Sequence, residues 1–443
     1  MNIQLSDHFT YRRLFRFVLP SILMMVVTSL YTIVDGFFVS NFIGKTAFAA
    51  VNLIIPVPLG VATIGYMVGS GGSAIVSRTL GERKKELANR YFSLLIYTVT
   101  IVSVILGILG FLFTRPISIF LGAEGELLEE CVRYGRILFA FIVFCILQVT
   151  FQSFLIMAQK PDLSLRTSLA AGFTNAALDY VFIVLFQWGV VGAALATVAG
   201  QMVGGIFPLL YFARKNSSLL RLRKTGWYGG MLRETCVNGS SEMVTNLSAS
   251  VVSMVYNFQL MKFVGETGVA AYGIIMYVNF VFMAVFFGYS MGASPIASYH
   301  YGAQNHAELK NIFCKSLWIV GMVGVGMTLL AEGLNGPIVR IFADYDPELY
   351  ALTSHGFRIF SFAFLLTGFN VWGSAFFTAL SNGVISALIS FIRTLVFELG
   401  TVLVLPYFLE VDGIWAAVLV AEVMALLLTG FFVLKKREQY QYL

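Results

Sequence analysis

Long apolar runs alternate with short polar breaks along the whole chain. An apolar run of about 20 residues is long enough to cross a membrane as a helix. The pattern therefore predicts membrane-spanning helices at residues 14–38, 49–73, 92–113, 132–157, 163–186, 190–212, 237–261, 270–292, 313–333, 355–378, 383–408 and 413–434, which makes 12 spans.

The composition agrees with a protein that is dissolved in lipid. Hydrophobic residues make up 58% of the 443 residues, the mean hydropathy is +0.82, and only 12% of the residues are charged. A soluble domain carries about a quarter charged residues. We therefore expect an all-α polytopic membrane protein that contacts membrane lipids along most of its length.

The basic residues predict the orientation of the spans. Lys and Arg gather in alternate breaks, within residues 12–16, 78–90, 214–233 and 435–437, whereas breaks such as "LGAEGELLEE" are acidic. Because cytoplasmic loops carry an excess of Lys and Arg, we expect both termini to be cytoplasmic and the protein to lie in the plasma membrane. The net charge of +6 is then explained by the basic residues of the cytoplasmic loops. We therefore expect no nucleic-acid partner.

The two halves of the sequence are similar to each other. With a shift of 221 positions, "FIGKTAFAAVNLIIPV" at 42–57 falls on "FVGETGVAAYGIIMYV" at 263–278, and "GGSAIVSRTLG" at 71–81 falls on "GASPIASYHYG" at 292–302. A shared membrane bias does not readily place Gly and Ser in register over such distances. The match therefore indicates an internal duplication.

The duplication predicts the domain organisation. Six spans per copy is an even number, so both copies have the same orientation and face each other across a cleft. We expect two pseudo-symmetric six-helix lobes, at residues 1–212 and 236–443, joined by a basic cytoplasmic linker at 213–235.

Asp35, in "YTIVDGFFVS", is a carboxylate inside the first predicted span. An ionised carboxylate inside a membrane costs at least ~2.5–3.5 kcal/mol. It persists there if it faces a polar cavity, pairs with another group, binds an ion or stays protonated. A position near the outer interface, where water reaches it, is the alternative.

Polar residues in the fifth and sixth spans can join Asp35. Asn175 and Asp179 are four residues apart and share one helix face, and the same spacing relates Thr197 to Gln201. Carboxylate, amide and hydroxyl oxygens suit Na⁺, and clustered carboxylates also suit a proton. The alternative, in which these residues only tie helices together, stays open.

Several further residues are candidates for a substrate cavity or for movement. Tyr31, Gln152, Gln201 and Glu242 are polar or aromatic residues in predicted spans and could line a cavity. Pro20 can act as a hinge in the first span, or as a static kink.

The second half has a different set of polar residues. Asn370 is in the tenth span, Arg393 and Glu398 in the eleventh are close enough in sequence to satisfy each other, and Glu422 stands where the first half has Gln201. The sequence leaves open whether Glu242, Glu398 and Glu422 take part in transport.

The sequence lacks the motifs of common enzymes and of ATP-driven transporters. The chain has no GxxxxGK[ST] sequence, its four His form no i,i+4 pair, and no Ser-His-Asp order is readable. We therefore expect no enzymatic activity, no cofactor and no need for an ATPase subunit.

These residues resemble the multidrug and toxic compound extrusion family. The resemblance covers nearly the whole chain and includes the twelve spans, the two lobes and the repeated Gly- and Ser-containing loops after spans two and eight. Within it, Asp35 and Pro20 match the first-span aspartate and proline of the family, and Glu242 matches its seventh-span glutamate. The stretches "NAALDYVF" and "GVVGAALAT" match the fifth- and sixth-span patterns that contain Asn175, Asp179 and Thr197.

The resemblance implies a secondary active multidrug exporter that works by alternating access. It implies antiport of amphipathic, often cationic organic compounds against H⁺ or Na⁺, with a coupling-cation site, here a possible Na⁺ site, at Asp35, Asn175, Asp179 and Thr197. Some relatives have a tenth-span aspartate where this chain has Asn370, which favours coupling through the first half. A lipid-linked saccharide flippase of the same wider superfamily is the alternative. The sequence does not identify the substrate, the coupling ion or the oligomeric state.

Overall fold

The computed structural model describes residues 3–344 and 346–442, and all regular elements in these residues are helical. This agrees with the predicted fold class. The first half contains α1 (Tyr11–Phe42), α2 (Lys45–Ile54), α3 (Pro56–Gly81), α4 (Lys85–Phe120), α5 (Gly125–Ala140), α6 (Ile142–Met157), α7 (Pro161–Asp179), the π-helix η1 (Tyr180–Leu185) and α8 (Gly189–Ala213). The second half contains α9 (Gly229–Phe263), α10 (Glu266–Gly302), α11 (His306–Ala343), α12 (Pro347–Ser361), α13 (Phe364–Ala379), α14 (Gly383–Phe391), the π-helix η2 (Ile392–Glu398), α15 (Leu399–Val404) and α16 (Pro406–Tyr440).

The helices account for the predicted spans with one exception. In the described residues, 9 helices are long and apolar enough to cross a membrane, and two bent pairs raise the number to 11. These correspond to all the predicted runs except 237–261, which lies within α9. That helix has 35 residues and is about 50 Å long, but "NGSSEMVTNLSAS" makes it more polar than the others.

Two of the spans are bent at a break in the helix. The α5–α6 pair bends by 53° and the α12–α13 pair by 49°, and the two pairs occupy the fourth and tenth predicted spans. Neither break contains a proline, which is the usual cause of a sharp kink. The matching bends therefore agree with the duplication, although the apolar pattern did not predict them.

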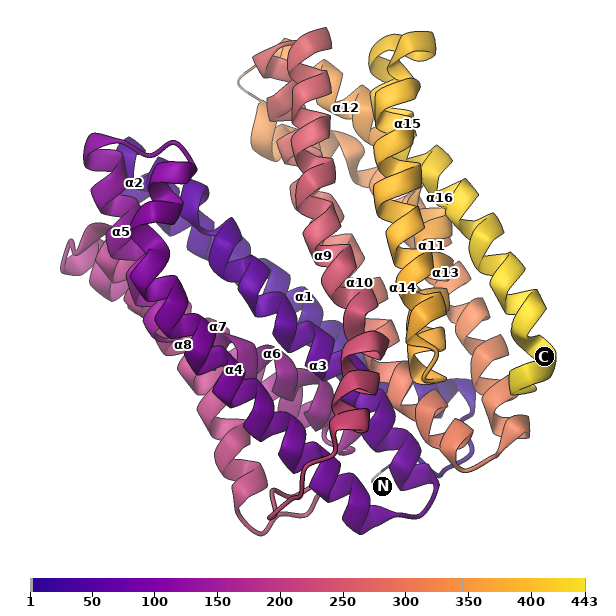
Figure 1. Cartoon of the computed structure of the whole chain (residues 1–443). Helices are drawn as coiled ribbons and strands as arrows, with labels where there is room; N and C mark the ends of the chain where they lie inside the picture. Colours follow the sequence, from indigo (N-terminus) through magenta and orange to yellow (C-terminus); the bar gives the residue numbers. More distant parts are fainter. Residues whose placement is uncertain (1–2, 345, 443) are drawn as a thin grey trace.

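The helices form two groups, α1–α8 and α9–α16, which diverge like the arms of a V (Figure 1). The groups meet at the end where the N-terminus and the segment between α8 and α9 lie. Both chain ends contact the start of α11: His8 Nδ1 is 2.6 Å from Glu308 Oε2, and His306 Nδ1 is 3.3 Å from the carbonyl oxygen of Tyr440. Both chain ends therefore lie at the same end of the molecule, as expected for two termini on one side of the membrane.

Symmetric hydrogen bonds join the two groups. The Ser77 hydroxyl donates to the carbonyl of Pro295 at 2.7 Å, and the Ser298 hydroxyl donates to the carbonyl of Ala74 at 2.6 Å. Ser77 and Ala74 are related to Ser298 and Pro295 by the same shift of 221 positions that aligns the two halves. The second bond is therefore the pseudo-symmetric copy of the first.

Glycines allow α3 and α10 to approach closely beside these bonds. A Cβ atom at Gly81 would meet the carbonyl oxygen of Tyr299, and a Cβ atom at Gly302 would meet the carbonyl oxygen of Arg78. These contacts are again related by the 221-residue shift. Any side chain larger than hydrogen would force the two helices apart at this end of the molecule.

Candidate functional site

Three helices bring predicted site residues together around Asp35. Asp35 is half-buried on α1, Asn175 lies on α7 and Thr197 lies on α8. The Asn175 Nδ2 and Thr197 Oγ1 atoms are each 3.4 Å from Asp35 Oδ1. The polar residues that the sequence placed on separate spans therefore form one cluster.

The threonine hydroxyl has two nearby acceptors and a single proton. Thr197 Oγ1 is also 3.0 Å from the carbonyl oxygen of Ala193 on its own helix, which is closer than Asp35 Oδ1. A proton given to Ala193 leaves the lone pairs of the hydroxyl available to a cation placed between Thr197 and Asp35.

Asp179 lies beside Asp35 and is completely buried, with 0% of the residue exposed. Within the described residues, no donor reaches either of its carboxylate oxygens or Asn175 Oδ1, and Asp35 is the neighbour with which Asp179 can share a proton. An unpaired buried carboxylate costs several kcal/mol. A bound proton or a bound cation would remove this cost.

A metal ion at this cluster would depend on more than carboxylates. In residues 3–344 and 346–442, no group of three or more His, Cys, Asp and Glu side chains is placed to hold a metal. The cluster offers two carboxyl groups, one amide oxygen and one hydroxyl. Such oxygen ligands suit a hard cation with weak preferences for coordination geometry, such as Na⁺.

The local sequence explains how α7 and α8 approach at the cluster. A Cβ atom at Gly200 would lie 2.8 Å from the carbonyl oxygen of Ala171 and 3.0 Å from Asn175 Cβ, so only glycine fits there. At Asp179 the α-helix ends and the π-helix η1 begins. π-Helical turns are frequent at functional sites, and the apolar pattern did not predict this one.

Tyr134 on α5 belongs to the surroundings of the cluster and was not predicted from the sequence. It is 1% exposed, faces both Asp35 and Asp179, and packs in the same buried cluster as Ala193 and Val198 of α8. A tyrosine in an apolar span gives no signal of its own, since most such residues only pack.

The other candidates of the first half are Tyr31, Gln152 and Gln201. Tyr31 packs against Gly172, where a Cβ atom would lie 3.0 Å from the tyrosine ring. Gln152 is buried and its Nε2 donates to Ser168 Oγ at 3.3 Å, and Gln201 is half-buried on α8. Their assignment to a substrate cavity stays a prediction.

Glu242 and Pro20 lie where the two groups of helices meet. Glu242 is half-buried on α9. Pro20 is buried inside α1, which continues as a helix on both sides of it. Directly after Pro20, α1 packs so closely on α10 that a Cβ at Gly288 would lie 2.6 Å from Ile22 Cα. The hinge role of Pro20 stays a prediction.

One expectation about the second half is wrong. Arg393 does not pair with Glu398; its Nε and Nη2 atoms donate to Glu422 Oε1, at 3.0 and 2.5 Å. Asn370 Nδ2 donates to the other oxygen of Glu422 at 2.6 Å. Arg393 lies near the start of the π-helix η2, and its guanidinium reaches Glu422 on α16.

Comparison with known proteins gives the family. The MatE family model matches the chain twice, at residues 20–181 and 243–403, and the two matches cover corresponding parts of the two halves. The chain belongs to the MatE family. This family consists of transporters and not of enzymes, and the protein is an integral membrane protein.

Curated relatives of this MatE protein share its length. It is 24% identical over 433 residues to the multidrug export protein MepA of Staphylococcus haemolyticus, an alignment that covers 97% of this chain and 94% of that protein. It is also 24% identical over 434 residues to MepA of Staphylococcus saprophyticus, with the same coverage.

Solved structures share the fold. A crystal structure of a MATE protein in complex with MaL6 superposes with a TM-score of 0.93, at 21% identity and 98% coverage of each chain. A multidrug resistance MATE family transporter in an outward-facing conformation gives a TM-score of 0.91, at 22% identity, covering 100% of this chain and 99% of that one. The protein therefore has the MATE fold.

Proposed function

We propose that the protein exports drug-like organic compounds, many of them cationic, from the cell by antiport with H⁺ or Na⁺. Its family consists of transporters, and its full-length relatives are multidrug export proteins. The observation that carries the coupling is the unpaired, fully buried carboxylate of Asp179 next to Asp35.

The coupling cation binds at Asp35, Asn175, Asp179 and Thr197. Two neighbouring carboxylates cannot both stay ionised without a positive charge, so the cluster takes up one H⁺ or Na⁺ when it faces the outside. One charge that crosses ~100 mV releases about 2.3 kcal/mol, enough to sustain roughly a fifty-fold gradient of an uncharged compound.

Cation binding leads to substrate release through movement of α1. The helix shifts about Pro20, the substrate leaves the cavity near Tyr31, Gln152, Gln201 and Glu242, and the lobes 1–212 and 236–443 then rock to face the cytoplasm. The linker 213–235 stays cytoplasmic, as do both termini, and the protein works in the plasma membrane. Bacterial exporters of this kind among its relatives support this location.

The test is efflux from proteoliposomes that contain the purified protein and a cationic dye. An imposed pH gradient and an imposed Na⁺ gradient are applied separately, and dye release is followed by fluorescence. We expect one of the two gradients to drive release by the wild type. Asp35→Asn should reduce that driven release at least tenfold, because the cluster loses a carboxylate that the cation needs.

Asp162→Asn is the matched control. Asp162 is an exposed aspartate in the first turn of α7, far from the cluster along the helix, so its substitution should leave driven release unchanged. Driven release by Asp35→Asn at the wild-type rate would contradict the proposal, and so would a wild type that responds to neither gradient.

A further inference from the structure

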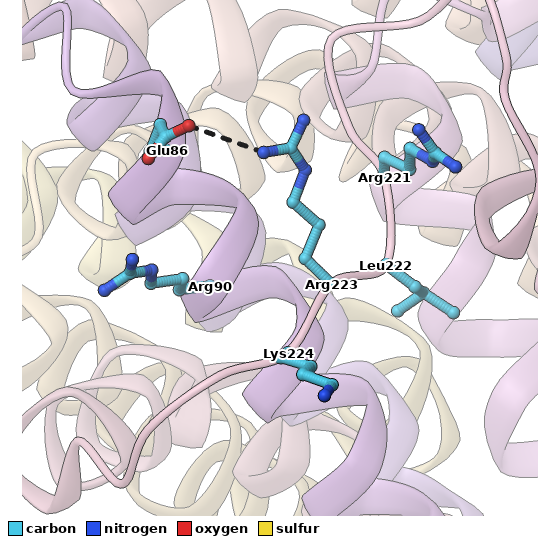
Figure 2. Close-up of a pocket in the computed structure, with 6 residues that line it drawn as sticks. All are labelled: Glu86, Arg90, Arg221, Leu222, Arg223 and Lys224. Atoms are coloured by element: carbon cyan, nitrogen blue, oxygen red, sulfur yellow. Dashed lines mark hydrogen bonds and ion pairs between the residues drawn. The ribbon is translucent and has the colours of Figure 1, made fainter.

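A basic pocket lies outside the transport site, between α4 and the segment that follows α8. The cavity has a volume of about 400 Å³ and is lined by Glu86, Arg90, Arg221, Leu222, Arg223 and Lys224. Four of these residues are cations and one is an acid. Figure 2 shows Arg223 extending from the linker toward Glu86 on α4, with Arg90 on the same helix.

Hydrogen bonds to α4 hold the linker in place. The backbone N–H groups of Arg221 and Arg223 donate to Asn89 Oδ1 at 2.6 Å and to Ser93 Oγ at 2.8 Å. The Thr225 hydroxyl donates to the carbonyl of Arg90 at 2.8 Å. The backbone of the linker is therefore fixed without the use of the side chains of Arg221 and Arg223.

Most of the positive charge in this pocket is not neutralised. Arg223 Nη1 is 3.4 Å from Glu86 Oε1, and both side chains are exposed, so this ion pair is weak. The other three cations of the pocket, Arg90, Arg221 and Lys224, form no ion pair with any of the described residues. The pocket therefore offers a net positive charge to an anion.

An apolar stripe on α4 continues from the pocket. Tyr97, Ile101, Val104 and Ile108 follow Arg90 at helical spacing, and they are 43%, 61%, 45% and 57% exposed. Residues with this spacing lie on one face, and an exposed apolar face of a spanning helix contacts acyl chains. Arg90 and Tyr97 are about 10 Å apart along the helix axis, so about two helical turns separate the basic pocket from the apolar stripe.

We propose that this pocket and stripe bind an anionic phospholipid of the cytoplasmic leaflet. The phosphate lies among Arg90, Arg223 and Lys224, and the acyl chains lie along Tyr97 and Ile101 toward Ile108. Guanidinium groups hold phosphate through paired N–H donors, and each basic residue near a charged membrane surface strengthens lipid binding about fivefold. Glu86 competes with the phosphate for Arg223.

Native mass spectrometry of the purified protein tests this binding and requires no transport activity. The protein is titrated with phosphatidylglycerol or with phosphatidylcholine of the same acyl chains. We expect the wild type to prefer phosphatidylglycerol. The variant Arg90→Gln/Arg223→Gln/Lys224→Gln should bind phosphatidylglycerol roughly 10- to 100-fold more weakly, with unchanged binding of phosphatidylcholine.

Two further variants separate this site from general charge effects and from misfolding. Lys435→Gln/Lys436→Gln/Arg437→Gln removes the same charge from the C-terminal tail and should keep the preference. Glu86→Gln should bind phosphatidylglycerol several-fold more tightly, a gain that an unfolded protein cannot give. Equal losses in both triple variants, or no loss in the pocket variant, would overturn the proposal.

Glycerol phosphate, which has the headgroup chemistry without acyl chains, distinguishes a lipid from a soluble anion. We expect it to displace phosphatidylglycerol only at concentrations at least a hundredfold higher than the lipid itself requires. Displacement at equal concentrations would assign the pocket to a soluble phosphate compound and overturn the assignment to lipid.

Discussion

Buried carboxyl groups in the two halves have opposite surroundings. Glu422 accepts hydrogen bonds from Arg393 on one oxygen and from Asn370 on the other. In the described residues, Asp179 has no hydrogen-bond partner on either oxygen. Arg393 is a fixed cation that is part of the chain, whereas Asp179 needs a charge or a proton from outside. This difference is the reason for placing the exchangeable cation in the first half.

Substitution of Glu422 should be costly for stability. Glu422→Gln leaves the Arg393 guanidinium buried without its counter-charge, and breaking a buried ion pair costs about 3–5 kcal/mol. We expect a clear drop in the thermal unfolding temperature of the detergent-solubilised protein. The double variant Arg393→Met/Glu422→Met removes both charges and should recover most of the loss. A double variant that is as unstable as the single one would contradict this account of the pair.

The sequence indicated which residues are chemically unusual, but not all of their partners. The family resemblance grouped Asp35, Asn175 and Thr197, which lie on separate spans, and the structure has them in contact. The pairing of Arg393 with Glu398 was wrong, because residues five apart do not share an α-helical face and Glu422 of α16 lies within hydrogen-bond distance of the guanidinium. A change from α- to π-helix depends on packing with neighbouring helices and leaves no clear sequence signal.

At the scale of elements, close contact between α3 and α10 holds the two groups of helices together at one end. The two serine hydrogen bonds and the contacts of Gly81 and Gly302 are copies of each other under the 221-residue shift. The contact surface is therefore made largely of backbone atoms and small side chains. Beside it, a buried hydrophobic cluster that includes Leu14 and Phe17 of α1 and Ile296 of α10 also joins the two groups.

Gly302→Ala should open this contact. The added methyl group would meet the carbonyl oxygen of Arg78, which is backbone and cannot move aside alone. We expect a longer distance between spin labels at Lys84 and Ala303, measured by double electron–electron resonance in a background without native cysteines. Gly326→Ala is the control, since a Cβ there has nothing within 4 Å. An unchanged distance in Gly302→Ala would contradict the close contact.

Some elements could be predicted from the apolar pattern and others could not. The long helices α1, α4, α10 and α11 follow from long apolar runs, whereas α16 contains a non-helical residue at Glu410, between the last two predicted runs. The bends between α5 and α6 and between α12 and α13 did not follow, since no proline marks them. The polarity of α9 shows a further difficulty, because a helix that faces other helices does not need an apolar surface all around.

At the scale of the whole molecule, two similar groups of helices differ in their acids: in the described residues, the fully buried carboxylate without a hydrogen-bond partner, Asp179, belongs to the first group. The family model matches both halves, so the helical framework has been kept in each. The polar residues differ between the halves. With the shift of 221 positions, Asp35 corresponds to Tyr256 and Gln201 corresponds to Glu422. Under our proposal the two arms move against each other, and the first arm supplies the cation site.

The most direct test of this account is the number of coupling cations that the purified protein binds. Binding of ²²Na⁺ and uptake of protons are measured separately in detergent for the wild type, for Asp179→Asn and for the control Asp162→Asn. The account predicts that the wild type and the control bind one exchangeable cation, either Na⁺ or H⁺, and that Asp179→Asn binds none. Equal cation binding by Asp179→Asn and the wild type would contradict it.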